Sequence, residues 1–174
     1  LCVLSQYNLG EDLLINGRNG GRYYWDKTGG FTTRAVSLDS LAGSTSAPTI
    51  AKQILVSDRD RHIIAFGCDT EANPGVQDPL AIRFSSQESL TDWATTAANT
   101  AGELRLGSGS EIVSAVETRQ QILVFTDESL YAMQFLGPPF PFGVNLVSAH
   151  ITTLGPLSAV PVKDNMFWME LKTI

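Results

Sequence analysis

The chain has 174 residues, of which 43% are hydrophobic and 17% charged, and its formal net charge is −6 at pH 7. This much apolar material supports a hydrophobic core, and the length predicts one domain. The acidic balance argues against binding to DNA phosphates, because few cations are present to displace counterions. No apolar run approaches the roughly 20 residues of a membrane-spanning helix, so we expect no membrane contact.

Short apolar runs separated by turn residues dominate the sequence, and helical periodicity is almost absent. Their β-branched and aromatic residues favour strands. In chain order, strands are expected at residues 13–15, 22–25, 33–36, 54–56, 63–66, 80–84, 112–116, 122–125, 130–135, 159–162 and 166–169. Tight turns are expected at 19–21, 58–60 and 127–129. Residues 87–93 predict either two helical turns or a turn filled by Trp93.

A pattern of an approach strand, a tight turn and a very apolar strand recurs along the chain, at residues 47–66, 109–127 and 155–169. Spacing of about 40–50 residues with about four strands per unit is typical of propeller blades. We therefore predict an all-β fold of β-propeller-like antiparallel blades. It forms a single region, 1–174, with about three units at 10–60, 61–118 and 119–174. A β-sandwich, whose strand spacing overlaps, is the alternative.

Three blades do not close a propeller, which typically needs at least four. The sequence therefore predicts an incomplete propeller. The first residue is Leu1 rather than Met, and an apolar run at 166–169 lies close to the last residue. Both features predict that the chain is a fragment of a longer polypeptide.

Cysteine and histidine residues offer no metal-binding pattern. Cys2 and Cys68 form no CxxC pair, and His62 and His150 lie far apart in the sequence. A zinc site would need about four ligands at suitable spacing, so none is expected. We expect both cysteines to be small buried side chains.

Acidic residues offer no catalytic pattern either. Residues 58–61 alternate acidic and basic at an expected turn, and His62 follows where a calcium loop would continue with an oxygen ligand. A solvated hairpin tip with a local ion pair is therefore expected there. Among eighteen acidic residues, no spacing singles out a pair for glycoside hydrolysis. We expect a protein that is not an enzyme, with no catalytic residue, no metal site and no cofactor.

Proline and phenylalanine alternate in the run at residues 138–142. The run predicts an ordered loop with Phe140 and Phe142 buried in a subunit or blade contact, because phenylalanine supplies buried area at low entropic cost. A polyproline ligand for an SH3-like groove is the alternative. The candidate subunit-interface residues are therefore Pro138, Pro139, Phe140 and Phe142.

Four stretches together resemble a known family. Residues 78–85 end in Arg-Phe-Ser and are followed by Asp92-Trp93. Residues 122–131 read Ile-Leu-Val-Phe-Thr-Asp-Glu-Ser-Leu-Tyr, 137–142 read Gly-Pro-Pro-Phe-Pro-Phe, and 165–169 read Asn-Met-Phe-Trp-Met. Their order, over about residues 50–170, resembles the tail hub and nozzle proteins of short-tailed bacteriophages. The likeness is fainter over residues 10–45.

The resemblance implies a virion structural protein that carries a β-propeller. Such proteins form rings, usually hexamers, below the portal and adaptor of the phage tail. The implied partners are neighbouring copies in the ring and other tail proteins such as the adaptor. The ring forms part of the DNA-ejection channel. The acidic charge is compatible with passive passage of DNA, and equally with an ordinary solvated surface. No catalytic residue is carried over, because the family is structural.

Two other function classes compete with this interpretation. A carbohydrate-binding or glycan-degrading propeller would need a cleft with two acids and exposed aromatic side chains, for which Tyr23, Tyr24 and Trp25 are the candidates. As a strand, these residues are expected to face alternate sides. An unrelated scaffold propeller is less favoured, because the WD and Kelch signatures are missing.

Overall fold

The computed structural model describes residues 3–163 and 165–170. Strands make up 43% of the structure and helices 4%, and the strands pair antiparallel, which confirms the all-β prediction. The chain divides into two compact units, Leu1–Arg105 and Leu106–Ile174. Each unit is described by itself.

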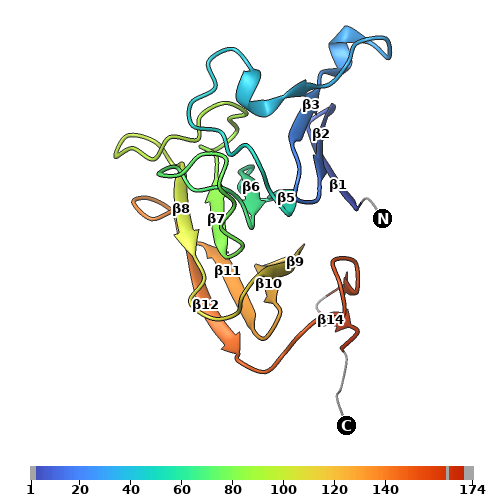
Figure 1. The fold of residues 1–174 in the computed structure, drawn as a ribbon, viewed down its shortest axis with the longest axis vertical. Coiled ribbons are helices and arrows are strands. Elements are labelled where there is room, and N and C mark those ends of the chain that lie inside the picture. Colours follow the sequence, from blue (N-terminus) through green and yellow to red (C-terminus); the bar gives the residue numbers. More distant parts are fainter. Residues whose placement is uncertain (1–2, 164, 171–174) are drawn as a thin grey trace. The chain divides into compact units, whose positions relative to one another are not determined.

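The first unit contains two four-stranded sheets, each a meander in chain order (Figure 1). The strands of the first sheet are β1 (Leu4–Leu9), β2 (Asp12–Gly17), β3 (Arg22–Trp25) and β4 (Val36–Ser37). Those of the second sheet are β5 (Gln53–Val56), β6 (Ile63–Phe66), β7 (Ala81–Phe84) and β8 (Gly102–Arg105). Two short 3-10 helices, η1 (Lys27–Gly29) and η2 (Leu38–Ser40), lie in the loops beside β4.

The two sheets of the first unit share one hydrophobic core. Leu14 of β2 packs in a cluster with Ile54 of β5, Ile63 of β6 and Trp93 from the β7–β8 loop. All four residues of β6 and all four of β7 are buried. Continuous apolar runs such as Ile-Ile-Ala-Phe are what a strand buried on both faces requires.

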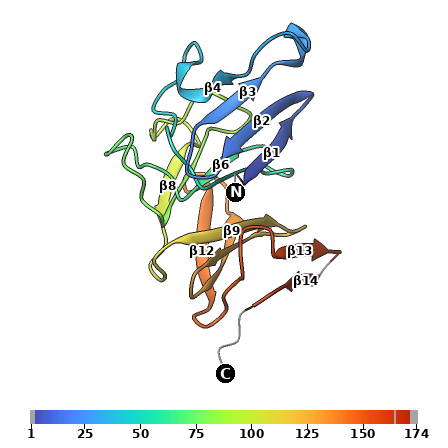
Figure 2. The same ribbon diagram turned by 45° about the vertical axis from the view of Figure 1, so that its right-hand side comes forward.

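The second unit contains one four-stranded sheet and one pair of strands, drawn in dark red in Figure 2. The sheet has the order β12-β11-β10-β9. Its strands are β9 (Ile112–Glu117), β10 (Ile122–Thr126), β11 (Leu130–Phe135) and β12 (Phe142–Ser148). The pair is β13 (Ala159–Val162) and β14 (Asn165–Trp168). Ala159 and Met166 pack against a cluster that includes Phe125, whose ring centroid lies 6.1 Å from that of Trp168.

The first two strands of every sheet are closed by the same kind of backbone hydrogen bond. A residue that follows the second strand donates its N–H to the carbonyl of a residue that precedes the first strand. The four donor–acceptor pairs are Arg18 to Val3 (2.9 Å), Asp69 to Ile50 (3.3 Å), Asp127 to Glu111 (3.1 Å) and Met169 to Ser158 (3.0 Å). The β13–β14 pair is therefore equivalent to the first two strands of each four-stranded sheet.

Strands with strong apolar runs were predicted well. The expected strands 22–25, 63–66, 130–135 and 159–162 coincide with β3, β6, β11 and β13, and Asn19 in the expected turn has a φ of 57°. The fourth strand of the first sheet begins later than expected, at Val36, and β1, β8 and β12 were not predicted. Of the two alternatives at 87–93, the helix was wrong and the turn filled by Trp93 is confirmed: these residues form turns and bends around a fully buried Trp93.

The sheets begin and end elsewhere than the expected units 10–60, 61–118 and 119–174. The expected first unit joins the hairpin at 12–25 to the strand at 54–56, whereas β5 is the first strand of the second sheet. The expected second unit likewise takes in β9, which is an edge strand of the third sheet. The reason is that the first two meanders end in strands that give no apolar signal, β4 with only two residues and β8 with the sequence Gly-Glu-Leu-Arg.

Candidate interaction surface

The proline-rich run forms the loop that joins β11 to β12. The N–H of Leu136 donates to the carbonyl of Pro141 at 2.7 Å, which closes the loop at its base. Phe135 and Phe142 pair across the two strands, and their rings meet edge to face with centroids 5.5 Å apart. Such an aromatic cross-strand pair fixes the hairpin beneath the loop.

Three of the four predicted interface residues are exposed on this loop. Phe140 is 74% exposed, Pro138 and Pro139 are exposed beside it, and Leu136 is 64% exposed. We call these four residues the Pro-Phe tip. Phe142 is only 4% exposed because it belongs to β12, so it supports the tip from within the sheet. Leu136 was not predicted as an interface residue. Its position directly after an apolar strand was the sequence feature that could have indicated an exposed apolar side chain.

A second exposed apolar area lies on the outward side of the β13–β14 pair. Val160 and Phe167 are cross-strand partners, 54% and 63% exposed. Together with Leu157 and Met169 they form what we call the β13–β14 outer face, where a hollow of about 240 Å³ opens. The opposite side of the same pair packs on Phe125 and its neighbours, as described above.

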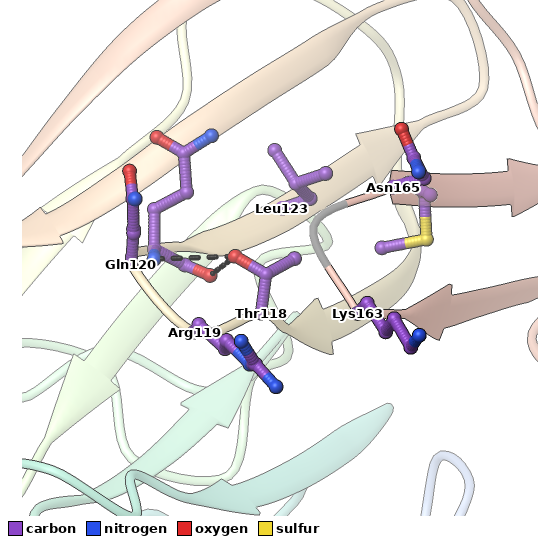
Figure 3. Close-up of a pocket in the computed structure, with 8 residues that line it drawn as sticks. Thr118, Arg119, Gln120, Leu123, Lys163 and Asn165 are labelled. Atoms are coloured by element: carbon purple, nitrogen blue, oxygen red, sulfur yellow. Dashed lines mark hydrogen bonds between the residues drawn. The ribbon is translucent and has the colours of Figure 1, made fainter.

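A smaller hollow of about 160 Å³ separates the β9–β10 turn from the β13–β14 turn. Arg119 and Lys163 line it from these two separate turns (Figure 3). Thr118 donates its hydroxyl to the carbonyl of Gln121 at 2.7 Å, which closes the β9–β10 turn. Two cations and several amides suit a small anion, but both cations are exposed surface side chains. This hollow therefore has the character of a solvated surface depression.

Asp69 is a buried carboxylate whose role is structural. It accepts hydrogen bonds from the backbone N–H groups of Thr49 (2.8 Å), Ile50 (3.2 Å) and Gly75 (2.7 Å), and from the Thr49 hydroxyl (2.7 Å). Burial raises the pKa of Asp69, but these hydrogen bonds outweigh it and hold the pKa below its ordinary value. The ionised side chain thus ties together two loops that flank β5 and β6.

Asp127 occupies the corresponding place in the third sheet. It accepts from the backbone N–H of Ser110 at 2.7 Å and from that of Glu111 at 3.3 Å. Burial raises its pKa, and the hydrogen bonds from Ser110 and Glu111 lower it by more. Asp69 and Asp127 therefore both serve the loop that leads into the first strand of their sheet.

Arg22 is fully buried, and none of its guanidinium nitrogens has a hydrogen-bond partner in the described part of the chain. Burial lowers its pKa to about 10, against the opposing effect of Asp69, Cys68 and Asp39. A buried charge without hydrogen bonds costs several kcal/mol in desolvation. We therefore expect the Arg22 guanidinium to lower the stability of the first unit.

Replacing Arg22 with methionine is expected to raise the free energy of unfolding by about 1 kcal/mol or more, because an apolar chain of similar length removes the desolvation cost. Urea denaturation followed by circular dichroism measures the change. Arg22→Ala is the matched variant, and its cavity is expected to cancel the gain. If Arg22→Met loses as much stability as Arg22→Ala, the guanidinium has partners that stabilise it.

His62 directly follows the β5–β6 turn and leads into β6. It is fully buried, and its Nδ1 lies 2.7 Å from the carbonyl oxygen of Ser85. Burial lowers its pKa, so at neutral pH the uncharged ring donates this hydrogen bond. Asp58 and Arg59 are exposed as expected, while Arg61 pairs with Glu88 at 3.0 Å, outside the turn.

Cys68 is fully buried, as predicted, and burial raises the pKa of its thiol to about 12. A thiol of this kind is almost entirely protonated at neutral pH and therefore unreactive. Cys2 lies outside the described residues. Within residues 3–163 and 165–170, no three His, Cys, Asp or Glu side chains gather in a group that could hold a metal ion.

The aromatic residues of β3 face alternate sides, as expected. Tyr24 turns inward and donates to Asp12 at 2.7 Å, whereas Tyr23 is 44% exposed. Trp25 is stacked with Phe31 at a centroid distance of 5.9 Å, and Phe31 is 98% exposed. One face of this sheet thus presents aromatic side chains to solvent.

Comparisons with known proteins do not assign the chain to a family. No protein-family model matches the sequence, and no curated protein matches it. Among the helices of the described residues, none has the length and apolar character needed to cross a membrane. The function is therefore inferred from the surfaces described above.

Proposed function

We propose that this chain is a structural subunit of a bacteriophage tail ring, of the nozzle or hub type, which forms part of the DNA-ejection channel. The sequence resemblance to such proteins suggests this function. The Pro-Phe tip is the observation that carries it. A loop that holds Phe140 and Leu136 in solvent is suited to protein contact, because phenylalanine is enriched at protein interfaces and the buried core of an interface is apolar.

The arrangement of the sheets supports a propeller-like subunit. Each four-stranded sheet is an antiparallel meander in chain order, and β13–β14 repeats its first half. Within each unit, successive sheets share a hydrophobic cluster, and their first strands contact each other, β1 with β5 and β9 with β13. The blades of a propeller are successive antiparallel meanders that pack on one another in this way.

Net charge is consistent with a channel that DNA passes through. The chain carries 12 basic and 18 acidic residues, which gives the formal net charge of −6. A surface of this sign repels phosphates and has few sites that would retain them. DNA therefore passes through the channel without being bound. The binding partners are neighbouring copies of the chain and other tail proteins such as the adaptor.

Phe140→Asp tests the proposal. We expect the unmodified protein to assemble into a closed ring, and the variant to assemble at least about tenfold more weakly, because a charge is buried without a partner in the contact. Mass photometry over a concentration series measures both. Phe31→Asp, at an exposed position in the other unit, is the control and should assemble normally. An unmodified protein that stays monomeric, or a Phe140→Asp variant that assembles normally, would contradict the proposal.

A carbohydrate-binding module is the second candidate. The stacked pair of Trp25 and Phe31, with Tyr23 exposed on the same strand as Trp25, favours it, because aromatic faces can pack on sugar rings. If this function is right, the protein binds at least one class of glycan on an array and Phe31→Ala weakens that binding. An array without any binding rules this candidate out.

A further inference from the structure

Asparagine followed by glycine is a chemically labile pair, and it occurs twice at the turn between β2 and β3. Of the seven asparagines in the chain, only Asn16 and Asn19 precede a glycine. Because glycine has no Cβ, its backbone nitrogen can approach the side-chain carbonyl carbon of the residue before it. The two sites share this sequence but differ in their surroundings, so we expect them to differ in reactivity.

Asn19 lies exposed in the turn, in the left-handed region with a φ of 57°. Its Oδ1 accepts a hydrogen bond from Nε2 of Gln77 at 3.1 Å. The same Gln77 nitrogen donates to the carbonyl of Gly67 at 2.7 Å, which holds the donor in place. A donor fixed at this oxygen polarises the side-chain carbonyl of Asn19 and stabilises the negative charge that develops on Oδ1 when a nucleophile attacks Cγ.

Asn16 is arranged in the opposite way. Its side chain is fully buried, away from water, and its Nδ2 donates to the carbonyls of Lys52 at 3.3 Å and Ala51 at 3.5 Å. These bonds retain the nitrogen that would have to leave. Among the described residues, no donor reaches Oδ1 of Asn16. Asn16 is therefore a reference for Asn19 within the same hairpin.

We infer that Asn19 is a site of spontaneous deamidation, in which the Gly20 nitrogen attacks the Asn19 side chain and Gln77 stabilises the oxyanion. The Gly20 nitrogen leaves its hydrogen bond to the Gly17 carbonyl (2.8 Å), gives its proton to solvent base and bonds to Cγ. The Cγ–Nδ2 bond breaks, and the nitrogen takes a proton from water and leaves as ammonia. Water then opens the cyclic imide to aspartate or, by attack at its other carbonyl, to isoaspartate. Water is the only other reactant.

The reaction changes a contact between the two sheets of the first unit. The N–H of Asn19 donates to the carbonyl of Ala51 at 2.9 Å, and the N–H of Ala51 donates to the carbonyl of Gly20 at 3.3 Å. Isoaspartate places an additional main-chain carbon between these two hydrogen bonds, so both cannot be kept. We therefore expect conversion to loosen the link between the β2–β3 turn and the segment that leads into β5. The inference goes beyond the proposed function and does not depend on the Pro-Phe tip.

Peptide mapping by mass spectrometry tests the inference on the full chain, incubated in mildly alkaline buffer. The mass gain that accompanies replacement of NH2 by OH measures conversion at each asparagine. In the folded protein we expect Asn19 to convert about tenfold or more faster than Asn16, because the buried Asn16 reacts only after local unfolding. In urea the two sites should convert at similar rates, because the fold no longer distinguishes them.

Gln77→Met separates the chemical role of Gln77 from a structural one. Methionine has a similar length but no N–H, so conversion of Asn19 in the folded variant is expected to slow about tenfold or more. In urea the variant should convert like the unmodified protein. If Gln77 only held the turn closed, the variant would convert faster. Conversion at Asn16 shows whether the variant is folded, and the comparison of Asn16 with Asn19 in the unmodified protein does not depend on the variant.

Three results would overturn the inference. One is the absence of conversion at Asn19 in the folded protein, and another is equal conversion at Asn16 and Asn19 in that state. The third is conversion of Asn19 in folded Gln77→Met that is as fast as in the unmodified protein or faster. All three are measured within single chains, so they are told apart from a failure of ring assembly.

Discussion

Trp93→Ala is expected to lower the free energy of unfolding of the first unit by about 3–5 kcal/mol. Trp93 is fully buried in the core shared by the two sheets of that unit, and it is the largest side chain there. Its indole N–H also donates to the carbonyl of Leu90 at 2.9 Å, so truncation leaves both a cavity and an unpaired carbonyl. Urea denaturation followed by far-ultraviolet circular dichroism measures the loss.

Phe31→Ala is the matched control for Trp93→Ala. Phe31 is an aromatic residue of the same unit, but it is 98% exposed, so its loss should change stability by about 0.5 kcal/mol or less. Equal effects of the two substitutions would mean that Trp93 does not fill the core between the sheets.

Asp69→Ala is expected to lower the free energy of unfolding by about 3 kcal/mol at pH 7, because several charge-assisted hydrogen bonds are lost and their donors are left unpaired. The effect depends on pH. The pKa of Asp69 is lowered in the folded state, so its contribution is complete above the unfolded value of about 3.9 and is lost as pH falls further. Unfolding measured at pH 7 and at pH 3 should therefore show a smaller difference between variant and unmodified protein at pH 3.

Asp60→Ala is the control that separates the contribution of Asp69 from the general loss of stability at low pH. Asp60 lies in the β5–β6 turn, and its side chain makes none of the hydrogen bonds that tie Asp69 to its loops. Asp78 and Asp127 also have lowered pKa values and remain in every variant, so only the difference between variants reports on Asp69. An Asp69→Ala variant as stable as Asp60→Ala at pH 7 would contradict the structural role of Asp69.

The sequence was sufficient to predict strands that are buried on both faces. Ile63–Phe66 and the first four residues of Ile122–Thr126 read as unbroken apolar runs because neighbours cover both faces of these strands. Leu4–Leu9 and Gly102–Arg105 were missed, since strands at a sheet edge alternate polar and apolar residues or carry charges. Their pairing is set by the strands beside them, which local sequence does not encode.

The candidate surface was predicted in part for the same reason. A run of proline and phenylalanine marks a rigid aromatic loop, but whether each ring faces solvent depends on strand register. Phe142 pairs with Phe135 and is buried, whereas Phe140, two residues earlier, lies in the loop and is exposed. Asp69 escaped prediction because its partner Thr49 is 20 residues away and meets it only in the folded chain.

Electron cryo-microscopy of the purified assembled protein tests the ring proposal most directly. The proposal predicts a closed ring of identical subunits in which each subunit contains antiparallel four-stranded meanders and Phe140 is buried against its neighbour. Single subunits only, or a ring in which Phe140 remains in solvent, would contradict it.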